Sequence, residues 1–236
     1  MTNVSLAQWN AAQAQEQKFW ESYAERYERF PQILLEHLGQ LRAAGESIRQ
    51  ELSSERITEA LEIGIGRLGI GVLGMQEPGF RITAVDPLER VSLNILDPAL
   101  NMYVQALQKK VTYQRSQGEF LPFDDDSFDF VCSHNVIDHA QNPASILEDA
   151  FRVLKKGCSL YFTLHILSRL GRMKIGMLRK ATPEKMIFVC HPHSFRHIDI
   201  GSELQKVGFE IVRQEGGHSP VFGRGRLSKF VCRKPA

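Results

Sequence analysis

The spacing of hydrophobic positions changes character near residue 57. From Leu6 to about Leu41, apolar and aromatic residues fall at spacings typical of helices. One predicted helix face carries aromatic side chains every three or four residues, at Phe19, Tyr23, Tyr27 and Phe30. Pro31 starts or bends a second helix that runs through Leu41, and we expect a third helix over Glu46–Ser53. The N-terminal region is therefore predicted to be helical throughout.

After residue 57, short apolar runs alternate with helical patterns. The runs that we expect to form strands are 57–65, 80–86, 111–116, 128–134, 158–166, 209–214 and 227–233. The helical patterns between them cover Ser92–Lys109, Pro143–Leu154 and Ile198–Val207. Strands that alternate with helices indicate a parallel sheet covered on both faces. The glycine-rich loop 215–226 alone separates the last two runs, which predicts an antiparallel pairing there. The pattern thus predicts an α/β fold, a doubly wound seven-stranded sheet with an antiparallel last strand.

Composition is that of an ordinary globular protein. The 236 residues are 43% hydrophobic and 24% charged, which allows one large domain or two very small ones. We expect a helical extension over 1–55 and one globular domain over 56–236. No apolar run approaches the roughly 18 residues that span a bilayer, and no basic segment followed by an apolar one opens the chain. With four scattered cysteines, these features predict a cytoplasmic protein without a transmembrane segment.

Charge is unevenly divided along the chain. Residues 1–150 hold 12 Lys and Arg against 22 Asp and Glu, a net charge of −10, whereas residues 151–236 hold 17 against 5, a net charge of +12. The two parts can pack together and neutralise each other, or the basic part can help to hold an anionic partner. The sequence leaves both interpretations open.

A glycine-rich turn follows the first predicted strand. Glycines at positions 64, 66 and 69 end the run that starts at Leu61, and such turns let a backbone lie against a ligand. The pattern alone is weak and would permit a nicotinamide dinucleotide. Glu62 precedes the glycines and Asp86 ends the next strand. A carboxylate beside the loop favours a cationic or zwitterionic ligand, and Asp86 suits a ribose diol.

The segment Gly118–Phe162 carries the strongest family signal. Its ordered matches are Gly118-Glu119, Leu121-Pro122-Phe123, Ser127-Phe128-Asp129, Ile137-Asp138-His139 and Arg152-Val153-Leu154-Lys155-Lys156-Gly157. In this order and spacing they resemble the class I S-adenosylmethionine-dependent methyltransferases, especially the small-molecule branch (methyltransferase type 11-like). The resemblance extends over about residues 57–213 and implies a Rossmann-like sheet with an N-terminal helical lid.

The resemblance also implies a cofactor site for S-adenosylmethionine, with S-adenosylhomocysteine as the product. The residues that it assigns to the cofactor are Glu62, Gly64, Gly66, Asp86, Pro87, Gln117, Gly118, Glu119, Ser133 and His134. The sequence departs from the family pattern at Leu68, where a third glycine is usual, at Gln117, where an acidic residue is frequent, and at Cys158, where a second glycine is usual. No metal is expected.

Two residues are candidates for catalysis. Histidine is the usual proton acceptor near neutral pH, and His139 stands where some small-molecule members use one. The resemblance pairs it with a tyrosine of the N-terminal helices, here Tyr27, or less favourably Tyr23. A packing or helix-capping role for His139 is the alternative.

The acceptor is expected to meet the C-terminal half. We predict contacts from Arg169, Arg172, His191 and His193, and hence an acceptor that carries a carboxylate or phosphate. The segment Ser168–Lys180 has five basic and no acidic residues among apolar ones. It is read as a solvated helix face, as a lid over an anionic acceptor, or as a contact to a membrane surface or nucleic acid.

These features predict methyl transfer to an oxygen or nitrogen atom of a small molecule. The alternatives are an RNA or protein methyltransferase that uses the basic half, and a non-catalytic protein that binds the cofactor. A nicotinamide-dependent oxidoreductase is disfavoured by Glu62, and a nucleic-acid partner is not expected. The sequence does not determine the acceptor or the oligomeric state.

Overall fold

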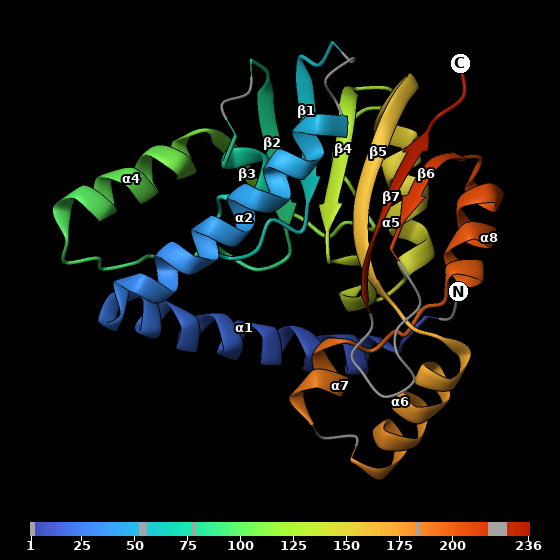
Figure 1. The fold of residues 1–236 in the computed structure, drawn as a ribbon, viewed down its shortest axis with the longest axis horizontal. Coiled ribbons are helices and arrows are strands. Elements are labelled where there is room, and N and C mark those ends of the chain that lie inside the picture. Colours follow the sequence, from blue (N-terminus) through green and yellow to red (C-terminus); the bar gives the residue numbers. More distant parts are fainter. Residues whose placement is uncertain (1–2, 52–55, 77–78, 183–184, 217–225) are drawn as a thin grey trace.

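The structure is a computed structural model that describes residues 3–51, 56–76, 79–182, 185–216 and 226–236. In this part of the chain, seven strands form one sheet in the order β3-β2-β1-β4-β5-β7-β6 (Figure 1). Their bounds are β1 Glu59–Ile63, β2 Arg81–Asp86, β3 Val111–Arg115, β4 Phe128–His134, β5 Leu154–Ile166, β6 Glu210–Glu215 and β7 Arg226–Arg233. The β7 strand is antiparallel to both neighbours and the other pairs are parallel, as predicted.

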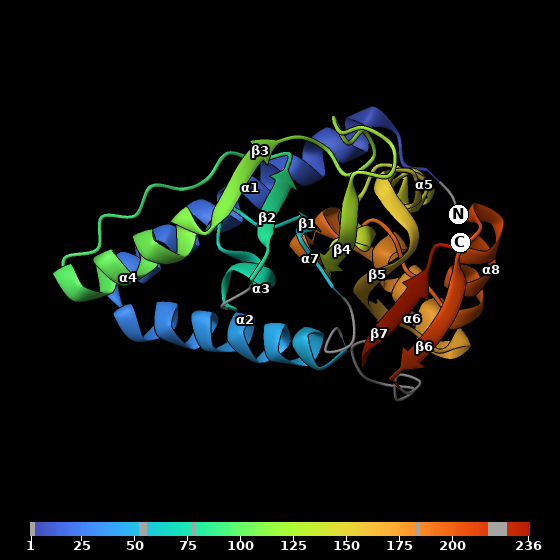
Figure 2. The same cartoon turned by 90° about the horizontal axis from the view of Figure 1, so that it is seen from above.

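Helices cover both faces of the sheet. They are α1 Leu6–Arg29, α2 Pro31–Glu51, α3 Gly71–Gly74, α4 Pro98–Lys109, α5 Pro143–Val153, α6 Arg169–Ala181, α7 Met186–Cys190 and α8 His197–Val207. Seen from above, α2 and α3 lie on one side of the sheet and α5 on the other (Figure 2). The α1 helix runs along the edge where the parallel strands end (Figure 1). Among the described residues, no helix has both the length and the apolar composition to span a bilayer.

Alternation along the strands builds two cores. In β1, Leu61 and Ile63 join the cluster beneath α5 and α8, whereas Ala60 joins the cluster on the opposite face with Ile48 of α2. Successive side chains of a strand point to opposite faces, so a strand buried on both sides is apolar at nearly every position. In β1, the four residues from Ala60 to Ile63 are all buried, and Glu62 is the one charged residue among them.

Two predicted helix bounds were wrong. The separate helix expected over Glu46–Ser53 does not exist, because α2 continues without a break from Pro31 to Glu51. Gly45 lies inside it, where an added Cβ would come within 2.4 Å of the Val72 carbonyl oxygen. The glycine serves close packing of α2 against α3 and does not end the helix. The helix expected from Ser92 begins instead at Pro98, because the Asp97 side chain caps it by accepting from the Leu100 N–H at 2.9 Å.

Candidate functional site

The turn after β1 leaves its backbone open. Gly64 and Gly66 both have φ of +74°, a left-handed conformation that favours glycine. An added Cβ at Gly64 would lie 2.3 Å from the Val136 side chain, and one at Gly66 would lie 3.1 Å from the Trp20 ring. Side chains are therefore excluded from both positions. The structure explains both glycines by backbone conformation and by packing against Val136 and Trp20, and their contact with a ligand stays a prediction.

Glu62 is buried beneath this turn. Its Oε1 accepts from the Val72 N–H at 2.8 Å and its Oε2 from the Leu73 N–H at 3.0 Å, so the carboxyl group fixes α3 to β1. Burial raises the pKa of Glu62 to about 7, and the two backbone N–H groups oppose the rise. The structure gives Glu62 this internal role. Its contact with the cofactor stays a prediction.

Asp86 ends β2 beside the same turn. Its Oδ2 accepts from the Gly66 N–H at 2.9 Å and its Oδ1 from the Leu88 N–H at 3.0 Å. Burial raises the pKa of Asp86 to about 6, and the nearby negative charge of Glu16 adds to the rise. Each carboxylate oxygen can accept a second hydrogen bond. The group is therefore fixed in place and still able to receive two ligand hydroxyls.

The other predicted cofactor residues lie where β2, β3 and β4 end. The Pro87 carbonyl accepts from Arg115 Nε at 3.0 Å. At Gly118 an added Cβ would come within 2.7 Å of Ile63, so only glycine fits. Glu119, one residue after Gly118 and two after Gln117, is buried, and its Oε1 accepts from the Gln141 N–H at 2.8 Å. This bond anchors the loop before α5.

The end of β4 offers polar atoms to a ligand. Ser133 Oγ and Asn135 Oδ1 are buried and have no hydrogen-bond partner among the described residues. Asn135 has φ of +58°, which asparagine tolerates better than most residues. His134 Nδ1 lies 3.0 Å from Thr163 Oγ1, and burial lowers the pKa of His134 to about 4, so its ring is neutral. Unpartnered buried atoms beside a glycine turn fit a polar ligand such as S-adenosylmethionine.

The α1 helix lies against the turn, and its action as a lid stays a prediction. Trp20 lies against Gly66, and Arg67 Nη1 donates to the Gln17 carbonyl at 3.4 Å. Glu16 Oε1 lies 3.0 Å from His139 Nδ1, in the short helical turn Ile137–His139 after β4. Residues of α1 thus contact both the first and the fourth strand ends. Glu16 could not be identified from the sequence, because a lone glutamate on a helix gives no signal of what faces it.

Tyr27 is buried beside the N-terminal helices, and its catalytic role stays a prediction. Its side chain is completely buried among Leu34, Leu68 and other residues of α1, α2 and α4, and its hydroxyl is hydrogen-bonded to His37 Nδ1. Burial raises the pKa of Tyr27 far above its usual value, so the hydroxyl stays protonated. Of the four aromatic residues at this spacing, Tyr27 is buried and Phe30 is exposed, so the spacing does not mark one uniformly buried face.

Asp138, His139 and His191 form a compact cluster. His191 Nδ1 lies 2.8 Å from Asp138 Oδ2, and the two histidine rings lie 4.1 Å apart between centroids. The side-chain hydrogen bond from His191 opposes burial and keeps the pKa of Asp138 below its usual value. Burial lowers the pKa of His139, but Glu16 and Asp138 outweigh it and the net shift is upward. The cluster thus joins an ionised carboxylate, a histidine favoured as a cation and a half-exposed histidine.

This cluster is also where a cation could bind. One ligand atom from each of Asp138, His139 and His191 can be chosen so that all lie within 4.8 Å of one another. One nitrogen of His139 is already engaged by Glu16 and one of His191 by Asp138. The absence of a metal from the reaction stays a prediction.

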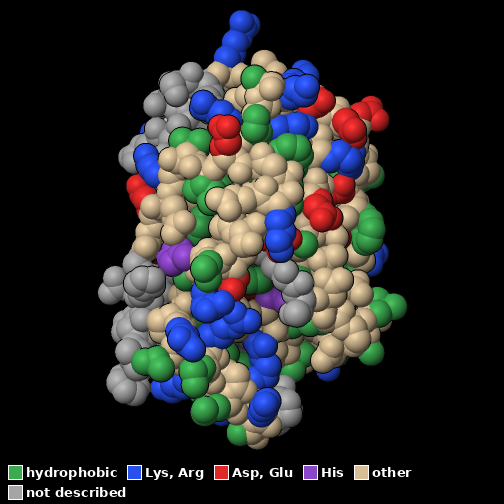
Figure 3. Space-filling view, turned by 90° about the vertical axis from the view of Figure 1, so that its right-hand side faces the viewer, with side chains coloured by type: hydrophobic (Ala, Val, Ile, Leu, Met, Phe, Trp, Pro, Cys, Tyr) green, Lys and Arg blue, Asp and Glu red, His purple; other side chains and the backbone are tan. Residues whose placement is uncertain are grey.

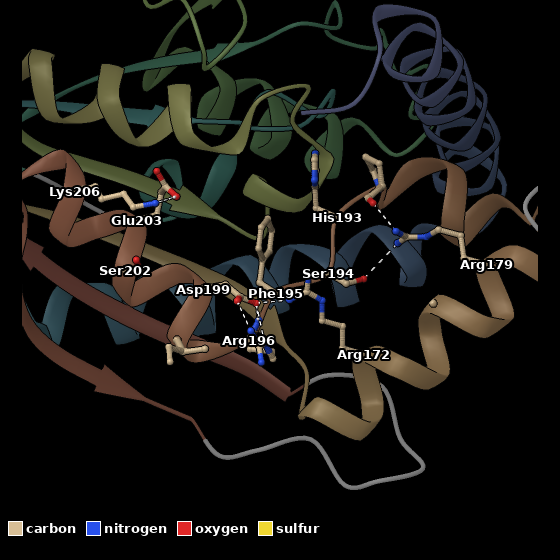
Figure 4. A pocket seen from close by; sticks show the side chains of 13 residues that line it. Arg172, Arg179, His193, Ser194, Phe195, Arg196, Asp199, Ser202, Glu203 and Lys206 are labelled. Atoms are coloured by element: carbon tan, nitrogen blue, oxygen red, sulfur yellow. Dashed lines mark hydrogen bonds and ion pairs between the residues drawn. The ribbon is translucent and has the colours of Figure 1, made fainter. Parts of the chain in front are cut away.

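The residues predicted to bind the acceptor are not all brought together. His191 joins the cluster, but Arg172 and His193 line a separate cavity of about 560 Å³ between α6 and α8, whose lining does not include the cluster (Figure 4). Arg172 Nη1 is paired with Asp199 Oδ2 at 2.7 Å. His193 is buried and its Nε2 lies 2.8 Å from the Ala140 carbonyl oxygen. Arg169 and Arg172 line a neighbouring open hollow.

Arg179 supports the segment that carries His191. Its guanidinium donates to the carbonyls of His191 at 2.8 Å and Pro192 at 2.6 Å. It also donates to Ser194 Oγ at 3.3 Å (Figure 4). Burial lowers the pKa of Arg179 from its usual value. In the sequence, Arg179 is only one of the five basic residues of Ser168–Lys180. Its partners come from a segment that the helix pattern does not reveal.

Part of this chain matches a known family of protein domains. Residues 61–162 match the model of a methyltransferase domain family. An uncharacterized protein of Methanocaldococcus jannaschii is 48% identical over 99 residues, which are 42% of this chain and 46% of that protein. The match therefore spans about half the length of that curated relative.

Three solved structures have a similar fold. A putative methyltransferase of Bacillus halodurans is 18% identical, with a TM-score of 0.60, over 84% of this chain and 99% of that one. A putative sarcosine dimethylglycine methyltransferase of Galdieria sulphuraria is 15% identical, with a TM-score of 0.61, over 82% and 86%. The 1,6-didemethyltoxoflavin-N1-methyltransferase of Burkholderia thailandensis, with bound 1,6-didemethyltoxoflavin and S-adenosylhomocysteine, is 14% identical, with a TM-score of 0.62, over 100% and 93%. Residues 61–162 thus match a methyltransferase-domain family, and the chain shares its fold with these solved methyltransferase structures.

Proposed function

We propose that this protein transfers a methyl group from S-adenosylmethionine to an oxygen or nitrogen atom of a small molecule. The observation that carries the proposal is the Asp138–His191 pair, 2.8 Å between Oδ2 and Nδ1, beside the glycine turn and beneath α1. A histidine oriented by a buried carboxylate is suited to accept a proton. The methyltransferase-domain match of residues 61–162 supports the same reaction class.

The cofactor would supply an activated methyl group on a sulfonium. Asp86 would accept hydrogen bonds from the ribose hydroxyls, and the backbone at Gly64 and Gly66 would lie against the methionine part. Ser133 Oγ and Asn135 Oδ1, which are buried without partners among the described residues, would meet its polar groups. Trp20 on α1 would exclude water from the turn.

We assign the proton acceptor to His191 and not to His139. Glu16 and Asp138 flank His139 and raise its pKa, so these carboxylates favour its protonated form and make it the poorer proton acceptor. His191 donates its Nδ1 hydrogen to Asp138, which leaves Nε2 as the basic atom. In the proposed step the acceptor atom bonds to the methyl carbon and the carbon–sulfur bond breaks with its electrons passing to sulfur. The acceptor's proton moves to His191 Nε2.

The small size of the acceptor is supported by the relatives. The Burkholderia structure contains 1,6-didemethyltoxoflavin, and the Galdieria protein is described as a putative sarcosine dimethylglycine methyltransferase. The negative charge predicted for the acceptor depended on Arg169 and Arg172, which line hollows away from Asp138 and His191. Our proposal therefore does not depend on an anionic acceptor.

Incubation of the pure protein with a metabolite extract and cofactor labelled in the methyl group tests this function. Mass spectrometry should reveal a labelled small molecule. Changing His191 to Asn should slow transfer about 10²- to 10⁴-fold, with the Kd for S-adenosylmethionine unchanged. A matched control is His165→Asn, an exposed histidine of β5. Equal loss in both variants, or label on RNA or protein alone, would contradict the proposal.

A further inference from the structure

One side of α6 presents apolar side chains to solvent. Leu170, Met173 and Met177 are 56%, 52% and 66% exposed, and their spacing of three and four residues aligns them along the helix. We refer to these three residues as the apolar stripe. The buried residue of α6 is Gly171, so most of the helix surface faces outward. The helix projects beyond the strand ends (Figure 1).

Cations accompany the apolar stripe. The α6 helix contains no acidic residue and has five basic ones, Arg169, Arg172, Lys174, Arg179 and Lys180. At 100° per residue, Arg169 and Lys180 lie on one flank of the stripe and Lys174 on the other. Figure 3 shows blue and green side chains gathered together at this end of the molecule. A hollow of about 380 Å³, lined by Arg169, Arg172, Met173 and Arg196, adjoins the start of the helix.

We propose that α6 binds the surface of a membrane that contains anionic phospholipids. The stripe would enter the headgroup region while the flanking cations contact lipid phosphates, the arrangement of an interfacial amphipathic helix. The apolar stripe contains no Trp or Phe, so apolar burial contributes modestly and the anionic charge of the lipid decides binding. In the hollow, Arg172 and Arg196 are paired with Asp199, so Arg169 would be the main contact to a headgroup phosphate.

Nucleic acid fits this surface less well. Single-stranded nucleic acids bind where aromatic side chains stack on bases, and α6 has no aromatic residue. A phosphate backbone also gains nothing from three exposed apolar side chains between the cations. The inference is independent of methyl transfer, because it concerns the outward face of α6 and not the cluster around Asp138.

Vesicle sedimentation with the full chain tests the proposal. Vesicles of phosphatidylglycerol and phosphatidylcholine should bind the protein, whereas pure phosphatidylcholine vesicles should not. The variant Met177→Asp should weaken binding, while Met102→Asp, on α4 where Met102 is 72% exposed, should leave it unchanged. Reversing charge at Arg169 and Lys180 together should lower the partition coefficient at least about tenfold, and reversing Lys109 on α4 should change it much less.

Melting temperatures measured for each variant establish that the fold is intact. The proposal is overturned if anionic vesicles do not bind the wild-type chain, or if Met177→Asp and Met102→Asp weaken binding equally. It is also overturned if a single-stranded RNA competes away the vesicles at equal phosphate concentration. Retained vesicle binding in His191→Asn would separate this surface from the proposed catalytic function.

Discussion

Glu16 of α1 and His139 after β4 form an ion pair, with 3.0 Å between Oε1 and Nδ1, that joins the N-terminal helix to the strand ends of the sheet. Both side chains are largely shielded from solvent. Asp86 is close enough that the charges of Glu16 and His139 shift its pKa in opposite directions. The charges of Glu16 on α1, His139 and Asp86 at the end of β2 therefore influence one another.

The first prediction concerns this pair. Because the pKa of His139 is raised above its usual value, the pair stabilises the closed helix fully below pH 6.5 and is lost as pH rises through the raised pKa. Removing the charge with Glu16→Gln should lower the pKa of His139, as measured by NMR titration of the histidine rings. The control is Glu21→Gln, since Glu21 Oε1 lies 3.7 Å from Arg67 Nη1; this variant should leave the pKa of His139 unchanged. An unaltered His139 titration in Glu16→Gln would refute the pairing.

The second prediction compares two glycines in the same conformation. Gly66 has φ of +74° and faces Trp20, whereas Gly157 has φ of +76° and an added Cβ would meet nothing within 4 Å. Substitution of either by alanine should lower the free energy of unfolding by about 1–2 kcal/mol, since both adopt left-handed backbone. Calorimetry should find that only Gly66→Ala also weakens S-adenosylmethionine binding. Equal cofactor affinity in the two variants would argue against the turn as the binding site.

The third prediction is a pH dependence of cofactor binding. With a pKa of about 6, Asp86 becomes protonated as pH falls through 6 and loses acceptor capacity for ribose hydroxyls. The Kd for S-adenosylmethionine should therefore increase below pH 6, although protonation makes burial of the carboxyl group less costly and favours the fold. Isothermal titration from pH 5 to 8 measures this trend. Asp86→Asn should bind weakly throughout and show a flatter profile.

The fourth prediction separates Tyr27 from catalysis. Its hydroxyl is hydrogen-bonded to His37, and its side chain is buried. Because Tyr27→Phe removes this hydrogen bond, it should lower the free energy of unfolding by about 1 kcal/mol. The melting temperature should fall, whereas the rate of methyl transfer should stay close to that of the wild type. Single-turnover kinetics with saturating cofactor provide the measurement. A large rate loss at unchanged cofactor affinity would restore the role that sequence resemblance gave to this tyrosine.

The fifth prediction concerns Glu62. Glu62→Gln replaces an oxygen that accepts from the Leu73 or Val72 N–H with a donor, which should cost about 1–3 kcal/mol in unfolding free energy. Because the pKa of Glu62 is raised to about 7, its contribution is greatest below pH 4.5 and falls as pH rises through 7. The stability difference between the wild type and Glu62→Gln should therefore shrink with rising pH in urea titrations.

The sheet was predictable because its signals are local. Continuous apolar runs such as Leu160–Phe162 mark strands buried on both faces, and the short glycine-rich connection before β7 marked the antiparallel pair. The extent of α2 was less predictable, because Gly45 resembles a helix end in sequence. Its actual role depends on α3, which lies against it only in the folded chain.

The place of a candidate site residue was predictable where the residue ends a predicted strand. Asp86 and the glycines lie at strand ends, so alternation of strands and helices already places them at one edge. His139 was found by its motif, but its partner Glu16 lies on another helix and had no signal of its own. For Tyr27 the regular aromatic spacing gave the helix but not the burial of the side chain, which depends on packing against α2 and α4.

The β7 strand follows β6 in the chain but lies between β5 and β6 in the sheet. During synthesis, β5 and β6 therefore emerge before the strand that must separate them, and each exposes unpaired backbone groups until β7 is made. The stacked rings of Phe162 and Phe230, 4.7 Å apart, form only at that final insertion. Nascent chains stalled before β7 should be the species most prone to aggregate and to engage chaperones.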